Sequence, residues 1–281
     1  MTELTPSGFL LEPSPTWLPY FGNQRRFVPY VLELLQGLGA RPSDTFYETN
    51  AGSHAISWHV NKLLGLTTFA NDLGAYSYAI GSALSGFDRD SRTAALGAAL
   101  IEEYGYLVPA DAPTPNSETI AKWIRFLREE SATNENRRRT NVLRGDLFEL
   151  LPSWSGDFIY CDFAWPWKDG SFTEEYEVTG DTLSLHLGDE TETQFRMASS
   201  RRILQDVLEY LDLARERFRF VILSNQSSNY PTPEVLEPHM RAAGHVPIIS
   251  RRLSVPAEYV DDLGKDPVFT EYQYVFEGRA A

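Results

Sequence analysis

Cysteine is almost absent from this chain of 281 residues, because Cys161 is the only one. A single cysteine excludes an intrachain disulfide and a zinc site built on several cysteines. Long hydrophobic runs are also missing, since no apolar stretch approaches the roughly 20 residues that a membrane helix needs. The first fifteen residues lack a basic start and a long apolar core, so they predict no signal peptide. We therefore expect a cytoplasmic protein with no membrane partner.

Positive charge is scarce as well. The chain has 25 Lys and Arg residues against 39 Asp and Glu residues, which gives a net charge of −14. This balance does not favour nucleic-acid binding, because phosphate contacts supply much of that affinity. The charges are segregated, however. Residues 117–144 hold seven Lys/Arg and four Asp/Glu, whereas residues 168–194 hold one Lys and eight Asp/Glu.

What is present is an ordinary globular composition, with 42% hydrophobic and 23% charged residues. Residues 156–162, GDFIYCD, start at a turn and continue as an apolar, aromatic run, which predicts a buried strand. In open α/β sheets, ligands bind beyond the carboxyl ends of the strands. Asp162 and Trp165 therefore stand where a functional site would be. A strand that simply leaves the core through an aromatic corner is an equally good interpretation.

The N-terminal half repeats the pattern of a strand followed by a polar turn. A helix over 27–38 ends at Gly39. A strand over 44–48 is followed by the small-residue turn 49–53 and a helix over 55–64. Such a turn places backbone N–H groups and a helix N-terminus near a ligand, although a plain connection is the alternative.

Two further strands are predicted to end at acids. Residues 66–70 lead into Asn71-Asp72, and residues 142–146 end in Gly145-Asp146 before a helical turn. An acid after the second strand often binds a ribose hydroxyl in doubly wound folds. Asn71 or Asp72 is equally suited to cap a helix.

The region between these strands is helical and polar, and it ends in the basic turn 137–139. Three arginines beside Asn and Thr suit contacts with phosphates and base edges, with solvated charge as the alternative. The acidic segment after the central strand has weak periodicity and predicts a mobile loop. The remaining elements are expected as a helix over 197–217, a strand over 220–223, a helix over 233–243 and strands near 246–254 and 270–276.

In this order and spacing, the blocks resemble the adenine-N6 DNA methyltransferases of the Dam-like (D12) class. The resemblance covers most of the chain and rests on the following residues. Tyr20 to Gln24 resemble the N-terminal cofactor block, Phe46 to Ser53 the EPFxGSG loop, Asn71-Asp72 the ND block, Gly145 to Phe148 the GDF block and Asp162 to Trp165 the DPPY block. The strand end at Ser224-Asn225 and the strand around Glu271-Tyr272 also fit.

The resemblance implies an α/β, Rossmann-like S-adenosylmethionine-dependent methyltransferase fold in a single domain over 1–281. It implies a helical DNA-recognition insert at about 76–141, and the acidic loop lies at about 168–194. The implied cofactor is S-adenosylmethionine, and no metal is implied. Its contacts would be Tyr20, Gly22, Asn23, Gln24, Glu48, Asn50, Ala51, Gly52, Ser53, Asn71, Asp72, Asp146 and Leu147. Double-stranded DNA would meet Lys122, Arg125, Arg137, Arg138 and Arg139.

The catalytic block departs from the family's pattern, because DFAW stands in place of DPPY. In the family, the acid and the next backbone carbonyl accept the N6–H bonds of adenine, and the aromatic residue stacks on the flipped base. The resemblance assigns these roles to Asp162, Phe163 and Trp165. The missing prolines, whose φ is fixed near −65°, leave the carbonyl less preorganised.

Two other functions fit the sequence. DFAW and the negative charge suit a non-catalytic subunit that binds cofactor or DNA beside a protein partner, and the acidic loop is a candidate surface for that partner. The negative charge also permits a methyltransferase of RNA or of a small molecule. The sequence leaves the oligomeric state and the recognition sequence open.

Overall fold

The computed structural model describes residues 24, 27–73, 75–86, 127–163, 165, 202–227, 229–256 and 268–279. Tyr20, Gly22, Asn23, Lys122, Arg125 and the acidic loop at about 168–194 lie outside these residues. The chain forms two compact units. The N-terminal unit comprises residues 8–146 with 175–195, and the C-terminal unit comprises residues 1–7, 147–174 and 196–281. The single-domain prediction and the insert at about 76–141 stay predictions.

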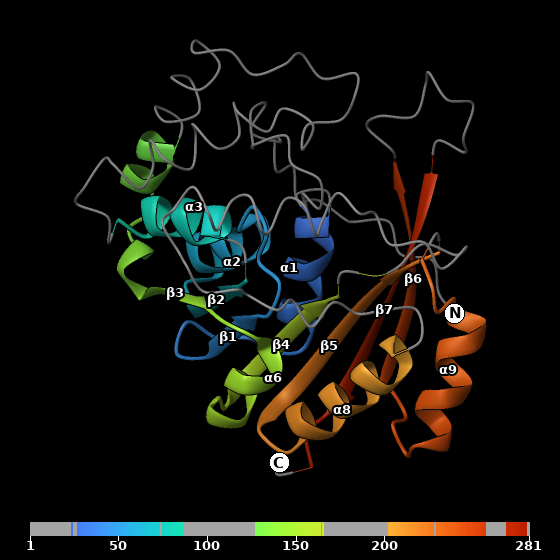
Figure 1. Ribbon diagram of the computed structural model, residues 1–281. Coiled ribbons are helices and arrows are strands. Elements are labelled where there is room, and N and C mark those ends of the chain that lie inside the picture. The colour runs from blue at the N-terminus through green and yellow to red at the C-terminus, as the bar shows by residue number, and fades with distance from the viewer. Residues whose placement is uncertain are drawn as a thin grey trace. The chain divides into compact units, whose positions relative to one another are not determined.

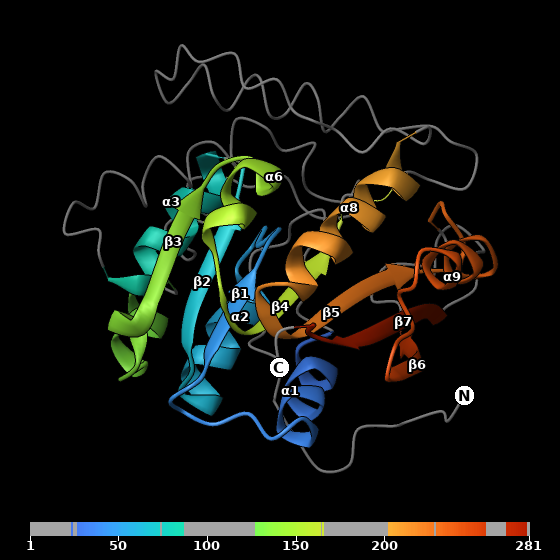
Figure 2. The ribbon, with the colours of Figure 1, turned by 90° about the horizontal axis from the view of Figure 1, so that it is seen from below.

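The described part of the N-terminal unit has three parallel strands in the order β3-β2-β1. Figure 2 shows these strands side by side. They are β1 (Thr45–Glu48), β2 (Thr67–Asp72) and β3 (Thr140–Arg144). The helical elements are α1 (Val28–Gly37), α2 (Ala55–His59), the π-helix η2 (Val60–Leu64), α3 (Ala75–Ser85), the helical residues 127–133 and the 3-10 turn η4 (Arg137–Arg139). Parallel strands joined through helices, in the order 3-2-1, form half of a doubly wound fold.

Local sequence explains the first elements of this unit. Apolar residues recur at helical spacing in α1, where Val28, Val31, Leu32 and Leu35 are buried. The helix begins with a proline in its first turn and is followed by Gly39 at φ 77°, as predicted. The Tyr47 and Phe69 rings of β1 and β2 stack with centroids 4.3 Å apart, and such cross-strand pairs fix the register.

The described part of the C-terminal unit contains four strands in the order β4-β5-β7-β6. Strand β7 (Val268–Glu277) is antiparallel to both of its neighbours, β5 (Phe218–Gln226) and β6 (Ile249–Pro256), whereas β4 (Gly156–Asp162) is parallel to β5. Its helices are α6 (Leu147–Leu150), the 3-10 turn η5 (Leu151–Ser153), α8 (Ile203–Arg215) and α9 (Pro233–Ala242). The predicted α/β class, with one antiparallel strand near the C-terminus, is confirmed.

Helix α8 covers this sheet through one apolar stripe. Ile203, Val207, Tyr210, Leu211 and Ala214 are buried at helical spacing. Figure 1 shows α8 lying along β5, with which it is in contact. Strand β4 is buried on both faces from Phe158 to Cys161, which confirms the buried central strand.

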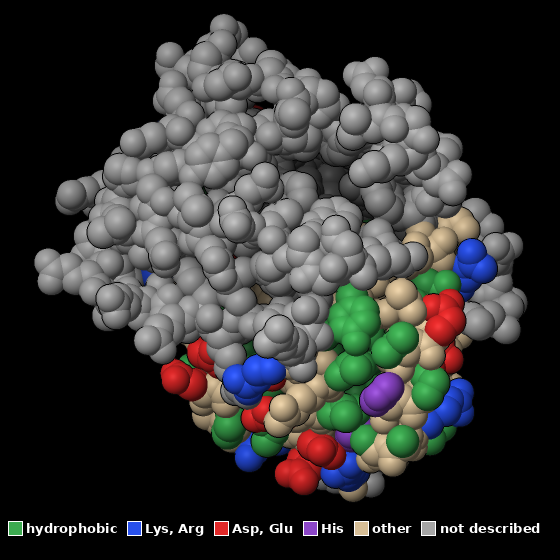
Figure 3. Space-filling model, turned by 45° about the vertical axis from the view of Figure 1, so that its right-hand side comes forward, with side chains coloured by type: hydrophobic (Ala, Val, Ile, Leu, Met, Phe, Trp, Pro, Cys, Tyr) green, Lys and Arg blue, Asp and Glu red, His purple; other side chains and the backbone are tan. Residues whose placement is uncertain are grey.

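Figure 3 shows part of the described surface, where hydrophobic side chains gather around a histidine and charged side chains lie at the border. The exposed large hydrophobic residues of the described chain are Leu63, Tyr78, Val246 and Ile248. Scattered exposures of this kind are normal for folded proteins. No helix within the described ranges is long and apolar enough to cross a membrane.

Several predicted boundaries were inaccurate. The helix expected over 55–64 is α-helical only to His59 and then widens into the π-helix η2. Within this turn, the Asn61 side chain donates to the Leu66 carbonyl at 2.9 Å and accepts from Asn134. Strand β3 begins two residues early and ends before Gly145. Strand β5 extends beyond its apolar run because it pairs with strands on both sides.

Candidate functional site

The first candidate site is the turn after β1. Glu48 at the end of β1 is buried, and its Oε2 accepts the Ser57 backbone N–H at 2.9 Å. A carboxylate at the first turn of α2 is stabilised by the partial positive charge there. Asn50 accepts the Thr49 hydroxyl at 2.7 Å, and Ser53 is buried. Glu48 thus fastens the turn to α2 from the strand side.

Asp72 at the end of β2 fastens the same turn from the other side. Its Oδ2 accepts the Gly52 backbone N–H at 2.8 Å, and Gly52 has a φ of 49°. The Ala51 N–H donates to the Asn71 carbonyl at 2.9 Å. The prediction that this turn aims its backbone N–H groups at a ligand is therefore wrong for Gly52 and Ala51, since both N–H groups have partners within the fold.

Asn71 draws a third predicted stretch into the cluster. Its amide nitrogen donates to the carbonyls of Thr49 at 3.2 Å and Gly145 at 3.1 Å. The Asn71 Oδ1 atom is buried and has no hydrogen-bond partner among the described residues. The predicted cofactor stretches 48–53 and 71–72 therefore meet Gly145, from the block before Asp146, at the carboxyl ends of β1, β2 and β3. We call this group of residues the strand-end cluster.

His54 was missed by the sequence reasoning, although it directly follows the predicted turn. It has a φ of 61°, which is unusual for a residue other than glycine. Its Nε2 donates to the Ser77 carbonyl at 2.7 Å, so the imidazole ties the turn to α3. Burial lowers the pKa of His54 to about 4, which keeps the ring neutral at physiological pH.

The His54 ring needs the glycine at position 81. A Cβ added to Gly81 would lie 2.4 Å from Cε1 of the His54 ring, well inside contact distance. A helix interior otherwise disfavours glycine, and this glycine was the signal that could have indicated a close neighbour. His54, Ser77 and Gly81 together hold the turn against α3.

The remaining cofactor residues are less closely connected to the strand-end cluster. Asp146 follows the end of β3, in the N-terminal unit, and is partly exposed. Leu147 begins α6 in the C-terminal unit, where it is buried. The Gln24 backbone carbonyl accepts the Phe27 N–H at 2.9 Å, directly before α1.

The second candidate site is the end of β4 in the C-terminal unit. Asp162 closes the strand, and the Trp165 indole Nε1 donates to its Oδ1 at 2.9 Å. The same N–H reaches the Ser224 carbonyl at 3.1 Å. Burial raises the pKa of Asp162 to about 7, and the indole hydrogen bond opposes that rise. Both protonation states are therefore accessible near neutral pH.

Phe163 has a packing role. Its side chain is buried and meets the Tyr210 ring of α8 edge-on at 5.6 Å between centroids. The position that carries proline in DPPY is thus filled here by a side chain of the core. The role predicted for the Phe163 backbone carbonyl stays a prediction.

Ser224 and Glu271 form a buried polar pair beside this strand end. The Ser224 hydroxyl donates to Oε1 of Glu271, and both residues are inaccessible to solvent. Asn225 donates to the Pro231 carbonyl at 2.9 Å. Both stretches belong to the resemblance, and the structure brings them together on β5 and β7.

Hydrogen bonds within the fold hold two of the three arginines of the predicted basic turn. Arg137 donates to the Asn134 carbonyl at 3.1 Å and packs beside Gly86, whereas Arg139 donates to the Thr67 hydroxyl at 3.2 Å. Only the middle residue of this triplet, Arg138, is fully exposed. Of the three arginines predicted to contact phosphates, Arg138 is therefore the most accessible to a phosphate. Contact with DNA stays a prediction for all three.

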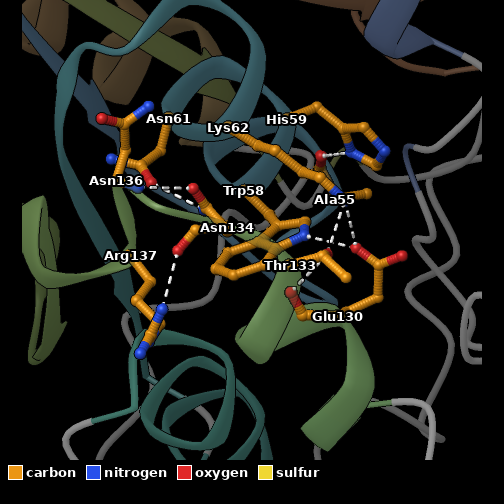
Figure 4. A network of polar contacts seen from close by, with 10 residues as sticks. All are labelled: Ala55, Trp58, His59, Asn61, Lys62, Glu130, Thr133, Asn134, Asn136 and Arg137. Atoms are coloured by element: carbon orange, nitrogen blue, oxygen red, sulfur yellow. Dashed lines mark hydrogen bonds and ion pairs between the residues drawn. The ribbon is translucent and has the colours of Figure 1, made fainter.

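Figure 4 shows the network that anchors this turn to α2 and η2. The Asn134 amide donates to Oδ1 of Asn61 at 2.8 Å. Glu130 accepts from Lys62 Nζ at 2.8 Å and from the Trp58 indole at 3.3 Å. Residues 127–137 are therefore attached to the helix that also follows the strand-end cluster.

The sequence matches no protein-family model and no curated protein. Its fold is similar to solved structures at low identity. A candidate RNA methyltransferase of Pyrococcus horikoshii has 13% identity and a TM-score of 0.44, with 93% of this chain and 88% of that chain covered. The hMettl16 catalytic domain, solved with the MAT2A 3′UTR hairpin 6, has 10% identity and a TM-score of 0.44, with 89% and 69% covered.

A third structure, the precorrin-6y C5,15-methyltransferase of Geobacter metallireducens GS-15, has 10% identity and a TM-score of 0.40, with 86% and 85% covered. Similarities this low assign no family, activity or substrate to the chain.

Proposed function

We propose that the protein is an S-adenosylmethionine-dependent methyltransferase that acts on the N6 amine of adenine in DNA. The observation that carries this proposal is the strand-end cluster, in which the turn 48–53, Asn71-Asp72 and Gly145 are joined by hydrogen bonds. Carboxyl ends of parallel strands are where open α/β sheets bind ligands. Acids end β1 and β2, at Glu48 and Asp72, and Asp146 lies two residues beyond the end of β3.

The chemistry of the cluster fits the proposed cofactor. S-adenosylmethionine carries ribose hydroxyls and amino groups, which are hydrogen-bond donors. The buried Asn71 Oδ1, without a partner among the described residues, is an acceptor of the matching kind. Asp72 would hold the ribose or methionine end, and Asp146 the adenine amine. Gly52 has no side chain that could obstruct a ligand at the turn.

The catalytic role falls to Asp162. When bound, the cofactor supplies an electrophilic sulfonium methyl group. The N6 lone pair of adenine is delocalised into the ring, so N6 is a weak nucleophile until its N–H bonds are oriented. An ionised Asp162 would accept one N6–H bond, and the Phe163 carbonyl would accept the other. A carboxyl whose pKa is about 7 is also suited to take up the proton that N6 loses.

The support for DNA binding comes from charge and exposure. The local excess of positive charge in residues 117–144 supports it, as does the exposed position of Arg138. The base must leave the helix before its amine is reached. Lys and Arg side chains that neutralise phosphates make binding weaken as salt concentration rises.

The test is methyl incorporation from labelled cofactor into DNA of varied sequence, with RNA as a parallel substrate. We expect transfer to DNA by the wild type and a loss of at least about 100-fold in Asp162→Ala. Asp162→Asn, which keeps an acceptor oxygen, should retain part of the activity. Equal incorporation by the wild type and Asp162→Ala would remove Asp162 from catalysis, and incorporation only into RNA would replace DNA as the substrate.

Cofactor binding is tested separately by calorimetry. A micromolar dissociation constant corresponds to roughly −8 kcal/mol. We expect Asp146→Ala to weaken binding, and Glu149→Ala, an exposed acid three residues away, to leave it unchanged. If both variants bind as the wild type does, Asp146 is not part of the cofactor site.

A further inference from the structure

Trp165 turns its indole N–H toward the end of β4. Its Nε1 lies 2.9 Å from Oδ1 of Asp162 and 3.1 Å from the backbone oxygen of Ser224. One N–H is thus shared between two acceptors. The bond to Ser224 fixes the indole to β5, and the bond to Asp162 fixes the carboxylate to the indole.

The indole ring is also held by aromatic neighbours. Phe163 meets the Trp165 ring edge-on, with centroids 5.4 Å apart and an interplanar angle of 68°. Phe163 in turn meets Tyr210 of α8 edge-on at 89°. Such contacts orient the rings as well as burying them. The indole is therefore oriented by its neighbours even without a substrate.

We propose that Trp165 is a positioning residue, whose indole N–H orients the Asp162 carboxylate and stabilises its ionised form. This role differs from the base stacking that the family resemblance implies for Trp165. The inference rests on the proposed function only where Asp162 is taken to accept a substrate N–H bond. The contact between the two side chains is independent of any substrate.

Polar side chains of the neighbouring strands share a face of the sheet with Asp162. Asp162 is in register with Ser224, Ser224 with Gln273, and Gln273 with Arg251, so these side chains form one row across four strands. Glu271 lies two residues along β7 and accepts from the Ser224 hydroxyl. In the described strands, the titratable and charged groups on this face are Tyr160 of β4, Glu271 and Glu277 of β7 and Arg251 of β6. A negative charge on Glu271 opposes ionisation of Asp162, and the positive charge of Arg251 favours it.

Arg251 is hydrogen-bonded to Gln273, its neighbour in the row. Its Nε and Nη2 donate to Oε1 of Gln273 at 2.8 and 2.6 Å. On the opposite face, toward α8, the described titratable groups include Cys161 of β4 and the buried Tyr210 and Asp206 of α8, and Cys161 and Tyr210 influence each other. The indole of Trp165 donates directly to Asp162, and burial opposes the charge that this hydrogen bond stabilises.

The experiment separates the N–H group from the ring. Trp165→Phe keeps an aromatic ring and removes the donor, whereas Trp165→Gln keeps a donor and removes the ring. Trp58→Phe is the matched control, because the Trp58 indole also donates to a carboxylate, that of Glu130. The probe is the carboxyl carbon-13 NMR signal of Asp162, identified by its loss in Asp162→Asn and titrated in the full-length protein.

We expect Trp165→Phe to raise the titration midpoint of Asp162 by about one pH unit, because hydrogen bonds to charged groups are among the stronger ones. Trp165→Gln should restore part of this shift, and Trp58→Phe should cause none. The acid limb of the methyl-transfer pH profile should move by the same amount, with the rate at high pH largely retained.

An unchanged midpoint in folded Trp165→Phe would overturn the inference. The inference would also be overturned if Trp165→Phe behaved as the wild type while Trp165→Gln lost nucleic-acid affinity without a shift of the Asp162 titration midpoint. That pattern indicates that the Trp165 ring stacks on a base. The NMR titration requires no activity, so a protein without methyl transfer would refute the proposed function and leave this test standing.

Discussion

Two strand-end acids, Asp72 in the N-terminal unit and Asp162 in the C-terminal unit, are held in different ways. Asp72 accepts a hydrogen bond from a backbone N–H, that of Gly52. Asp162 accepts one from a side chain, the indole of Trp165. A backbone donor is present whatever residue occupies its position. A side-chain donor depends on one residue, so a single substitution changes the environment of Asp162 without changing the course of the chain.

The residues around Asp72 and around Asp162 differ in the same way, because mainly backbone groups hold the first site and side chains hold the second. Around Asp72, the turn is fixed by backbone bonds of Ala51 and Gly52 and by the neutral ring of His54. Around Asp162, aromatic rings and a buried Ser224–Glu271 pair provide the support. We infer that the first site is preformed and tolerates few changes, whereas the second is open to tuning of its pKa.

The largest effect expected at the first site comes from Gly81→Ala. The added Cβ would lie 2.4 Å from the His54 ring, so the ring or α3 must move. Overpacking of this kind costs about 1–3 kcal/mol. Urea unfolding should show this loss. The control is Gly37→Ala in α1, where no atom lies within 4 Å and alanine favours the helix.

The double variant His54→Ala with Gly81→Ala sharpens the test. Removal of the ring makes room for the added methyl group, so the second substitution should cost less in this background than alone. Additive losses would show that the two residues do not contact each other, and the turn would then be held by its backbone bonds alone.

Asp72→Ala should have the next largest effect. The substitution leaves the Gly52 N–H without its acceptor, at a cost of about 1–3 kcal/mol for a buried donor. Asp72→Asn keeps an acceptor oxygen and should lose less. The measurement is the free energy of unfolding of both variants beside the wild type. Equal losses would mean that the charge of Asp72, and not its hydrogen bond, stabilises the turn.

The comparison also explains what the sequence could and could not predict. Strand ends at Glu48, Asp72 and Asp162 were predictable, because alternation of apolar runs and polar turns is a local signal. The contact between His54 and Gly81 joins residues 27 positions apart, and nothing in either local stretch specifies it. The direction of the Trp165 indole depends on Ser224, 59 residues away, so its hydrogen bonds could not be predicted from the local stretch, and base stacking by Trp165 stays a prediction.

A pH titration of stability is expected to distinguish Asp162 from an ordinary acid. The pKa of Asp162 in the folded protein is about 7, above the value of about 3.9 in an unfolded chain. The folded state therefore holds a proton that the unfolded state has lost between these values. Stability contributed by this group is complete below about pH 4 and falls as pH rises toward 7.

Asp162→Asn removes this dependence, because an amide does not titrate. We expect the variant to gain at least about 1 kcal/mol relative to the wild type between pH 4 and pH 8. Unfolding measured at both pH values provides the comparison. Parallel curves for the two proteins would place the Asp162 pKa near its ordinary value, and Asp162 would then titrate as an ordinary acid does.

The smallest effect on stability is expected from Arg138→Ala. Arg137 and Arg139 donate to the Asn134 carbonyl and the Thr67 hydroxyl, whereas Arg138 is exposed between them. A surface substitution of this kind changes the free energy of unfolding by no more than about 0.5 kcal/mol. DNA binding should still weaken at every sequence, and the salt slope should fall by about one. Arg137→Ala is the matched variant, because it should lower stability more and the salt slope less. If Arg138→Ala leaves both the affinity and the salt slope unchanged, the turn is a structural anchor for η2 and residues 127–137, and DNA contacts must be sought elsewhere in the chain.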